Sequence, residues 1–499
     1  MAEDLKPSEY YNKGLSDRKP YEDRAEEFAE ITIPALFRKE GESGSDAMKD
    51  RYVQSLGAKL VNNLVAKIGI TLFPPSSSGF KLSPKAEDLL ELTQGNTDML
   101  SEINRIISMS SESINRGIEI QEIRRDVFGL VEQLIVVGSA IMEKVPDNGI
   151  KVHGLRSFVV TLDDNGEAWK MCIVETLTQL PKELIGFMDE DKDEYELYTM
   201  ATLDRATDKW TVIQEVGGEI VGKEKVYNKK KFPFEYQGMR WSIGEKYHRP
   251  FVEDSYGSIN SYDKLSRVLT EGALIASKSL IFVDERGGRT RKRDVATSVN
   301  GAVIDGRADD VTSFQHNKNF DFQVPMQVRE ELKRELSETF LAMSSITRQA
   351  ERVTAEEISR MGQELETALS GVYARMSSKI SRRVITWVMN ELKIDLKAMS
   401  VDIITGLNAL GLSNEIMKLD GFMTRLGQLQ MTNWVEQKEL VDRYAIGYGV
   451  NTVNLVKTPQ QVQQELQAQQ AQMAQQQLVQ SGADSLGKSA GQALMGGQA

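Results

Sequence analysis

The chain has 499 residues, of which 40% are hydrophobic and 27% are charged, so it can bury several hydrophobic cores and is not disordered as a whole. Its 61 Lys and Arg residues are outnumbered by 73 Asp and Glu residues, which gives a formal net charge of −12. This charge excludes a protein that coats nucleic acid with its whole surface, so any contact with DNA must be local. The single cysteine, Cys172, excludes an internal disulfide and suits a reducing compartment.

Neither the N-terminus nor the most apolar stretch of the sequence indicates a secreted or a membrane protein. The first ten residues carry Glu3, Asp4 and Glu9 and lack the apolar region of a secretory signal. The most apolar stretch, 127–142, contains Glu132 and is too short for a bilayer, which needs about 20 apolar residues. We therefore expect a protein that is made in the cytoplasm and has no membrane span.

Helical periodicity dominates the first 150 residues. Apolar side chains recur at helical spacing over 58–72, where Pro74-Pro75 ends the pattern, and again over 103–114 and 123–135. The last of these helices is expected to end near the turn Pro146-Asp-Asn-Gly149.

A small β layer is expected over about 150–245. Asp164-Asn165-Gly166 separates two apolar runs and predicts a β-hairpin. A second antiparallel pair is expected at about 195–198 and 210–216, and Lys229-Lys230-Lys231 is expected on a connecting loop.

Two helices bracket a loop-rich insert after Pro250. The first is expected to begin near Ser255 and to carry its apolar face as far as Leu280, and the second begins at Pro325. A longer helical pattern follows Thr354 and continues nearly to Leu396. Its likeliest bend points are Gly362 and Gly371, because glycine weakens a helix interior.

Basic residues gather in two places. Five lie within eight positions of the insert: Arg286, Arg289, Arg291, Lys292 and Arg293. They could hold phosphate, dock an acidic partner or form a solvated loop, and the sequence does not decide between these roles. Two more, Arg348 and Arg352, lie in a short polar linker between helices, which either presents charge or simply connects them.

Patterns for catalysis are weak. Residues 482–489 match the phosphate-loop spacing, but only ten residues follow and no strand is expected before them, so we interpret the match as chance. The acidic run 189–194 lacks the glycine and closing glutamate of a calcium loop. His153, His248 and His316 stand singly, so we expect no catalytic residues, no metal, no cofactor and no enzyme. An ATPase acting through 482–489 or a metal nuclease acting through 189–194 remains the alternative.

Several short motifs occur in a characteristic order. They are Pro20-Tyr-Glu22, Thr32-Ile-Pro34, Gly57-Ala58 with Asn62-Asn63-Leu64, Leu72-Phe-Pro74, Ser255-Tyr-Gly257, Arg352-Val-Thr-Ala-Glu-Glu-Ile358, Glu364-Leu-Glu366 and Gly371-Val-Tyr373. Together they resemble the portal, or head-to-tail connector, proteins of short-tailed, autographivirus-type bacteriophages. The resemblance runs from about residue 8 to 460.

The resemblance implies an α+β, mainly helical portal fold with wing, stem, clip and crown regions assembled as a ring. Carried onto this chain, it gives the following regions: N-terminal wing 1–252, first stem helix 253–283, clip 284–324, second stem helix 325–345, channel loop 344–353, long bent wing helix 354–400, crown region 401–480 and flexible tail 481–499.

The resemblance also implies a function: a dodecameric ring at one capsid vertex of the virion, through which double-stranded DNA is packaged and ejected and which joins head to tail. Arg348 and Arg352 would then face DNA in the channel loop. Arg286, Arg289, Arg291, Lys292 and Arg293 would lie in the clip that docks the motor or the tail. The implied partners are terminase, tail adaptor and tube proteins, the major capsid and scaffolding proteins, and internal core proteins. Another ring-forming head–tail adaptor is the alternative.

Overall fold

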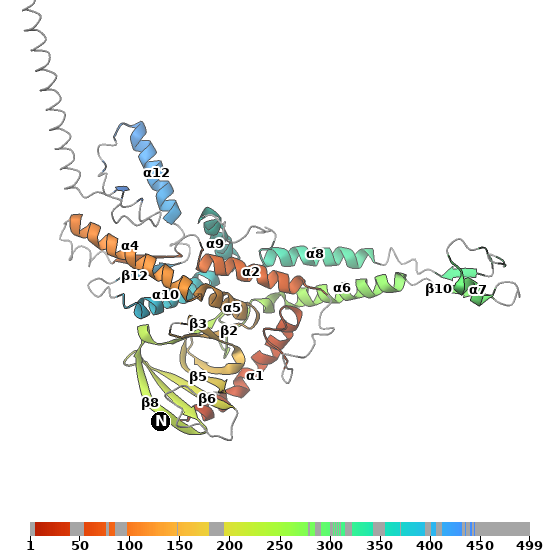
Figure 1. The fold of residues 1–499 in the computed structure, drawn as a ribbon, viewed down its shortest axis with the longest axis horizontal. Helices are drawn as coiled ribbons and strands as arrows, with labels where there is room; N and C mark the ends of the chain where they lie inside the picture. The colour runs from red at the N-terminus through yellow and green to blue at the C-terminus, as the bar shows by residue number, and fades with distance from the viewer. Residues whose placement is uncertain are drawn as a thin grey trace, which may run out of the picture. The chain divides into compact units, whose positions relative to one another are not determined.

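A computed structural model describes most of the chain (Figure 1). The described residues are 5–39, 54–75, 79–84, 97–146, 148–178, 194–277, 280–284, 291–299, 303, 305, 307, 309, 311–314, 322–342, 355–369, 371–394, 401–405, 412–431, 435, 440–441 and 444. The chain divides into two compact units. One comprises Met1–Lys81, Ile114–Asp395 and Ile403–Leu410, and the other comprises Leu82–Ser113, Leu396–Asp402 and Gly411–Ala499.

Helices α1 (Pro7–Ile31), α2 (Leu56–Leu72) and α5 (Ile123–Val136) contribute to the core of the first unit. The predicted periodicity is confirmed in α2, because Leu60, Val61, Leu64 and Ile68 are all buried and α2 packs on α5. Helix α4 (Thr97–Ile120) was also predicted. Among the described residues, no helix combines the length and apolar character that a membrane span requires.

Strands begin earlier than the sequence predicted. Helix α5 gives way at Gly138, whose φ is +94°, to β2 (Ser139–Lys144). This strand pairs antiparallel with β3 (Ile150–His153) on one side and with β9 (Phe234–Gly238) on the other. The expectation that residues up to the turn at Pro146 are helical was therefore wrong, because the apolar run of β2 gains two strand neighbours.

A five-stranded antiparallel sheet confirms the predicted hairpins. Its strands follow chain order: β4 (Phe158–Leu162), β5 (Ala168–Leu177), β6 (Tyr195–Asp204), β7 (Lys209–Val216) and β8 (Glu219–Asn228). At the first hairpin, Asp163 Oδ1 accepts hydrogen bonds from the backbone N–H groups of Asn165 and Glu167, at 3.0 and 2.9 Å. Strand β8 was not predicted, and Lys229–Lys231 form a short 3₁₀ helix, η3. Another 3₁₀ turn, η1 (Leu155–Ser157), links β3 to β4.

The insert contains regular structure. After a 3₁₀ turn, η4 (Val252–Ser255), helix α6 (Tyr256–Ser277) precedes β10 (Leu280–Val283), α7 (Lys292–Thr297), β11 (Val311–Phe314) and α8 (Gln323–Thr339). The prediction of one helix reaching residue 283 was wrong, because Leu280–Val283 pair with β11. Strand formation suits this run, which is rich in residues that favour strands.

The long helix predicted after Thr354 is two helices, α9 (Ala355–Leu369) and α10 (Val372–Glu391). Gly371 separates them with a φ of +79°, which confirms one of the two predicted bend points. Helix α9 continues through Gly362 without a break. The remaining described elements are β1 (Phe80–Pro84), β12 (Val401–Thr405) and α12 (Leu412–Gln428).

Candidate functional site

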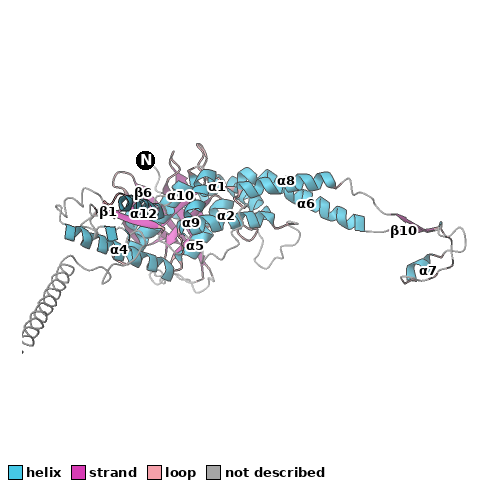
Figure 2. Cartoon of the chain, turned by 90° about the horizontal axis from the view of Figure 1, so that it is seen from above, coloured by secondary structure: helices cyan, strands magenta, loops and turns pink. Residues whose placement is uncertain are grey.

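Helices α6 and α8 lie side by side, and the chain between them forms a separate small element, the tip (β10, α7 and β11) (Figures 1 and 2). The two strands of the tip are antiparallel, with Leu280 opposite Phe314 and Val283 opposite Val311. The tip is thus inserted between two paired helices. Such an insert is suited to contact a partner molecule.

Close packing holds the helix pair together. A Cβ atom added to Gly272 of α6 would lie 2.3 Å from Cε1 of Phe322, the residue before α8. Glycine thus allows the two helices to approach each other. Large apolar side chains on the same pair nevertheless remain exposed to solvent; these are Val268, Leu274, Val324, Met326 and Val328. These exposed side chains are available for contacts with another molecule.

The tip carries three of the five predicted clip residues. Arg291, Lys292 and Arg293 are exposed at the start of α7. The first turn of this helix is formed by hydrogen bonds from the backbone N–H groups of Asp294 and Val295 to the Arg291 carbonyl. The short helix thus places three basic side chains together at the surface. The other two, Arg286 and Arg289, lie outside the described residues.

The far end of α8 is anchored by α2. Asn63 Nδ2 of α2 donates hydrogen bonds to the backbone carbonyls of Phe340 and Leu341, at 3.1 and 3.2 Å. These carbonyls end the helix, where no intrahelical donor remains for them. Phe340 is fully buried and its ring packs edge-on against Phe251 at 5.2 Å. The end of α8 is therefore fixed both by polar and by apolar contacts.

Helix α9 is anchored by the same helix, one turn further along. Lys67 Nζ lies 2.9 Å from Glu364 Oε2, and the Lys67 side chain is only 2% exposed whereas that of Glu364 is 44% exposed. Ile358 of α9 packs on Ile70 of α2. Helix α2 thus contacts both helices that flank the predicted channel loop in the sequence. Arg348 and Arg352, the candidate channel residues, lie outside the described residues.

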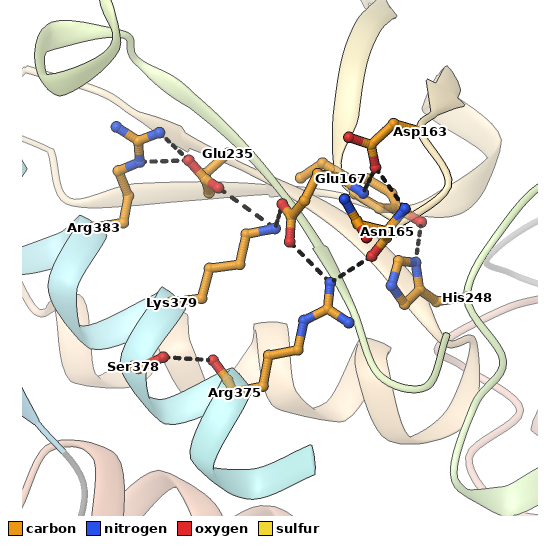
Figure 3. A network of polar contacts seen from close by, with 10 residues as sticks. Asp163, Asn165, Glu167, Glu235, His248, Arg375, Ser378, Lys379 and Arg383 are labelled. Carbon is orange, nitrogen blue, oxygen red and sulfur yellow. Dashed lines mark hydrogen bonds and ion pairs between the residues drawn. The ribbon is translucent and has the colours of Figure 1, made fainter. Parts of the chain in front are cut away.

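A ladder of ion pairs fastens α10 to the strands (Figure 3). Its three cations, Arg375, Lys379 and Arg383, recur every four residues and therefore lie on one face of the helix. Arg375 and Lys379 contact Glu167 at 2.9 and 2.5 Å. Arg383 forms a close two-nitrogen contact with Glu235 of β9, and Lys379 Nζ lies 3.7 Å from the same carboxylate.

The ladder also perturbs two titratable groups. Burial acts to raise the pKa of Glu167, but Lys379 and Arg375 outweigh it, so the pKa is lowered from its ordinary value. Burial lowers the pKa of His248 to about 3, and the charges of Arg375 and Lys379 add to the effect. His248 is therefore neutral at physiological pH.

Sequence reasoning missed the residues that hold these elements in place. Asn63 and Lys67 were part of the motifs or pattern of α2, yet only the structure shows that they contact α8 and α9. The four-residue spacing of the α10 cations was the one available signal for the ladder. The phosphate-loop match at 482–489 and residues 189–193 of the acidic run lie outside the described residues.

Comparison with known proteins identifies the family of this chain. A family model described as the bacteriophage head to tail connecting protein matches residues 8–455. The chain belongs to this family.

Its relatives include portal proteins of T7-like phages, which confirms the resemblance found in the sequence. The chain is 28% identical to the portal protein of Enterobacteria phage T3, covering 91% of this chain and 88% of that protein. It is 28% identical to the portal protein of Escherichia phage T7, covering 93% and 90%. The portal protein of Pseudomonas phage phiKMV is 26% identical, covering 89% and 90%.

A chain from the neck of a native gene transfer agent particle with C12 symmetry also matches, with 10% identity and a TM-score of 0.34. That match covers 77% of this chain and 98% of the other.

Proposed function

We propose that this chain is the subunit of a dodecameric ring at one capsid vertex, through which double-stranded DNA is packaged and ejected and to which the tail attaches. The observation that carries the proposal is the α6–α8 pair, which is anchored at one end by α2 and carries a basic tip in the chain between its two helices. In this reading α6 and α8 form the stem, and the chain between them, with the tip, forms the clip. Residues 344–353 form the channel loop, 1–252 and 354–400 the wing, 401–480 the crown and 481–499 the C-terminal tail.

Ring formation is supported by the exposed apolar side chains of the helix pair, including Val268, Leu274 and Met326. In a ring of identical subunits each pair would lie against the next, and these side chains would lose their contact with water. The net charge of −12 per subunit supports a conduit rather than a tight DNA-binding protein. Repeated around a ring, it repels phosphate over most of the surface, so that DNA can slide.

Such a ring would have partners on both sides. Terminase, and later the tail adaptor or tube proteins, would bind at the clip. The major capsid, scaffolding and internal core proteins would bind on the head side. The subunit would be synthesised in the cytoplasm of the host and would act as a structural protein rather than as an enzyme. Terminase and the tail proteins would bind the clip one after the other, so both would use the same exposed surface.

The oligomeric state tests the proposal most directly. Native mass spectrometry and electron microscopy of the purified protein are expected to give rings of about twelve subunits around a hole wide enough for duplex DNA. A stable monomer or dimer over a range of salt concentrations would contradict the proposal.

Reversing the charge of the tip should weaken partner docking. The variant Arg291→Glu, Lys292→Glu, Arg293→Glu is expected to form normal rings but to attach tails at least about tenfold less often, because like charges would face an acidic partner. Tail attachment would be counted by electron microscopy of assembled particles. The matched control reverses the three exposed lysines of η3, Lys229–Lys231, and should attach tails normally. Equal attachment by both variants would refute the role of the tip.

Removing the two channel arginines should weaken the hold on DNA. We expect Arg348→Ala with Arg352→Ala to assemble rings yet retain less packaged DNA, because a ring of positive charge would be lost. The fraction of DNA-filled heads after packaging measures this effect. A control with Lys223→Ala and Lys230→Ala, two exposed lysines of the wing, should retain DNA like the parent. Normal retention in the arginine variant would contradict the assignment.

A further inference from the structure

Three side chains with metal-binding atoms converge between two sheets of the first unit, the three-stranded β3-β2-β9 sheet and the five-stranded sheet. They are Glu143 of β2, His153 of β3 and Glu175 of β5, and one ligand atom from each lies within 4.8 Å of the other two. We infer that these residues form a binding site for a divalent transition metal, with Zn²⁺ as the best match, which links the β3-β2-β9 sheet to the five-stranded sheet.

Strand pairing brings two of the ligands together. Glu143 of β2 lies opposite Lys151 of β3, and Ile141 lies opposite His153. Because side chains two residues apart share a face of a strand, Glu143, Lys151 and His153 all lie on one face of this sheet. His153 Nε2 is 2.7 Å from Glu143 Oε2. Glu175 completes the cluster from the neighbouring sheet, so the site is assembled only in the folded chain.

The spacing of the donor atoms suits a tetrahedral ion. Zinc binds imidazole nitrogen and carboxylate oxygen at about 2.0 to 2.2 Å, which places neighbouring ligand atoms about 3.3 Å apart. The observed separations run from 2.7 Å to at most 4.8 Å and bracket this value, so small side-chain rotations are sufficient. One imidazole and two carboxylates also leave a fourth position for water.

Burial and charge are consistent with a bound cation. The side chain of His153 is 3% exposed, whereas those of Glu143 and Glu175 are 23% and 18% exposed, so the site is sheltered but open to solvent on its carboxylate side. Two carboxylates face one ammonium group, that of Lys151, which pairs with Glu175. The two carboxylates outnumber the one ammonium group, and a divalent ion would offset this excess negative charge.

The simpler reading is two independent ion pairs, Glu143 with His153 and Lys151 with Glu175. It explains each contact but does not require all three ligand atoms to converge from two sheets. The Lys151 side chain is 48% exposed and can turn into solvent when a metal arrives. A nitrogen donor beside two carboxylates favours zinc over magnesium or calcium, which prefer oxygen ligands throughout.

Metal binding by the purified full-length protein tests the inference. After treatment with a chelator and removal of the chelator, Zn²⁺ titrated into the protein is expected to bind at one site per subunit and to raise the melting temperature. Co²⁺ should give the visible absorption bands of a tetrahedral site. His153→Asn, Glu143→Gln and Glu175→Gln should each weaken Zn²⁺ binding by at least about tenfold.

The controls separate this site from adventitious binding. Glu224→Gln removes an exposed carboxylate of β8 and should leave Zn²⁺ affinity unchanged. If His153→Asn fails to fold, Glu175→Gln still tests the site, because it leaves the β2–β3 pairing intact. Absence of stoichiometric binding, or binding that survives both Glu143→Gln and Glu175→Gln, would overturn the inference. The result does not depend on ring formation, because all three ligands belong to one subunit.

Discussion

Replacing Glu235 with alanine is expected to lower the free energy of unfolding by about 3 kcal/mol, near the lower end of the cost of breaking a buried ion pair. Arg383 contacts Glu235 through two nitrogen atoms, and the two side chains are only 13% and 14% exposed. Removing the carboxylate leaves a buried guanidinium that has lost its ion-pair partner. The cost is reduced because Arg383 Nη1 still donates to the carbonyl of Lys229 at 2.7 Å.

Urea unfolding at a fixed protein concentration, followed by circular dichroism, measures this loss. Asp23→Ala serves as the control, because Asp23 and Lys19 form an exposed pair at 3.3 Å that should contribute less than about 0.5 kcal/mol. A double variant, Glu235→Leu with Arg383→Met, should regain much of the loss, since a buried pair replaced by apolar groups costs little. A Glu235→Ala shift as small as that of Asp23→Ala would show that the Arg383–Glu235 pair does not stabilise the fold.

Stability should fall as the pH is lowered from about 6.5, because of His248. Its side chain is buried, and its Nδ1 lies 3.0 Å from the hydroxyl of Tyr236. Since burial, Arg375 and Lys379 lower the folded pKa to about 3, the unfolded chain binds a proton that the folded chain does not. Stability is therefore complete above the unfolded pKa and declines by up to about 1.4 kcal/mol per pH unit between about 6.5 and 3.

Comparison with a variant isolates the contribution of this histidine. His248→Asn keeps a hydrogen-bond acceptor for Tyr236 but cannot take up the proton, so its unfolding free energy should decline less steeply over the same range. The comparison is cleanest between pH 6.5 and 5, because Glu167 acts in the same direction only at lower pH. Its depressed pKa makes its contribution present above about pH 4.5 and lost as the pH falls further. Parallel curves for parent and variant would contradict the assignment.

Much of the fold could be read from periodicity. The helical patterns of α2 and α5 were correct because each presents one apolar face to a core over several turns. The pattern of α8 also marked a helix, but among its residues only Leu336 is buried within the subunit. The hairpin at Asp164-Asn165-Gly166 was correct because its turn residues act locally. Strands β2 and β10 were missed for the opposite reason. Short apolar runs next to helices fit either structure, and only pairing with the distant strands β9 and β11 decides between them.

The candidate site shows the same division. The basic residues at the start of α7 could be found by counting charge along the chain, and all three are exposed. Asn63 could not be assigned a role in this way. Its hydrogen bonds join residues 277 and 278 positions apart, and an asparagine in a helix gives no sign of which carbonyl it will contact.

The two anchor points on α2 affect how much the sequence between α8 and α9 can change. Asn63 and Lys67 are one helical turn apart, about 6 Å along the axis, and they fix the two flanking helices independently of the residues that join them. We therefore expect a segment of different length or charge at 343–354 to leave α8 and α9 in place. In the proposed function this segment is the channel loop, so its contact with DNA could be changed by evolution or by design while the supporting helices stay the same.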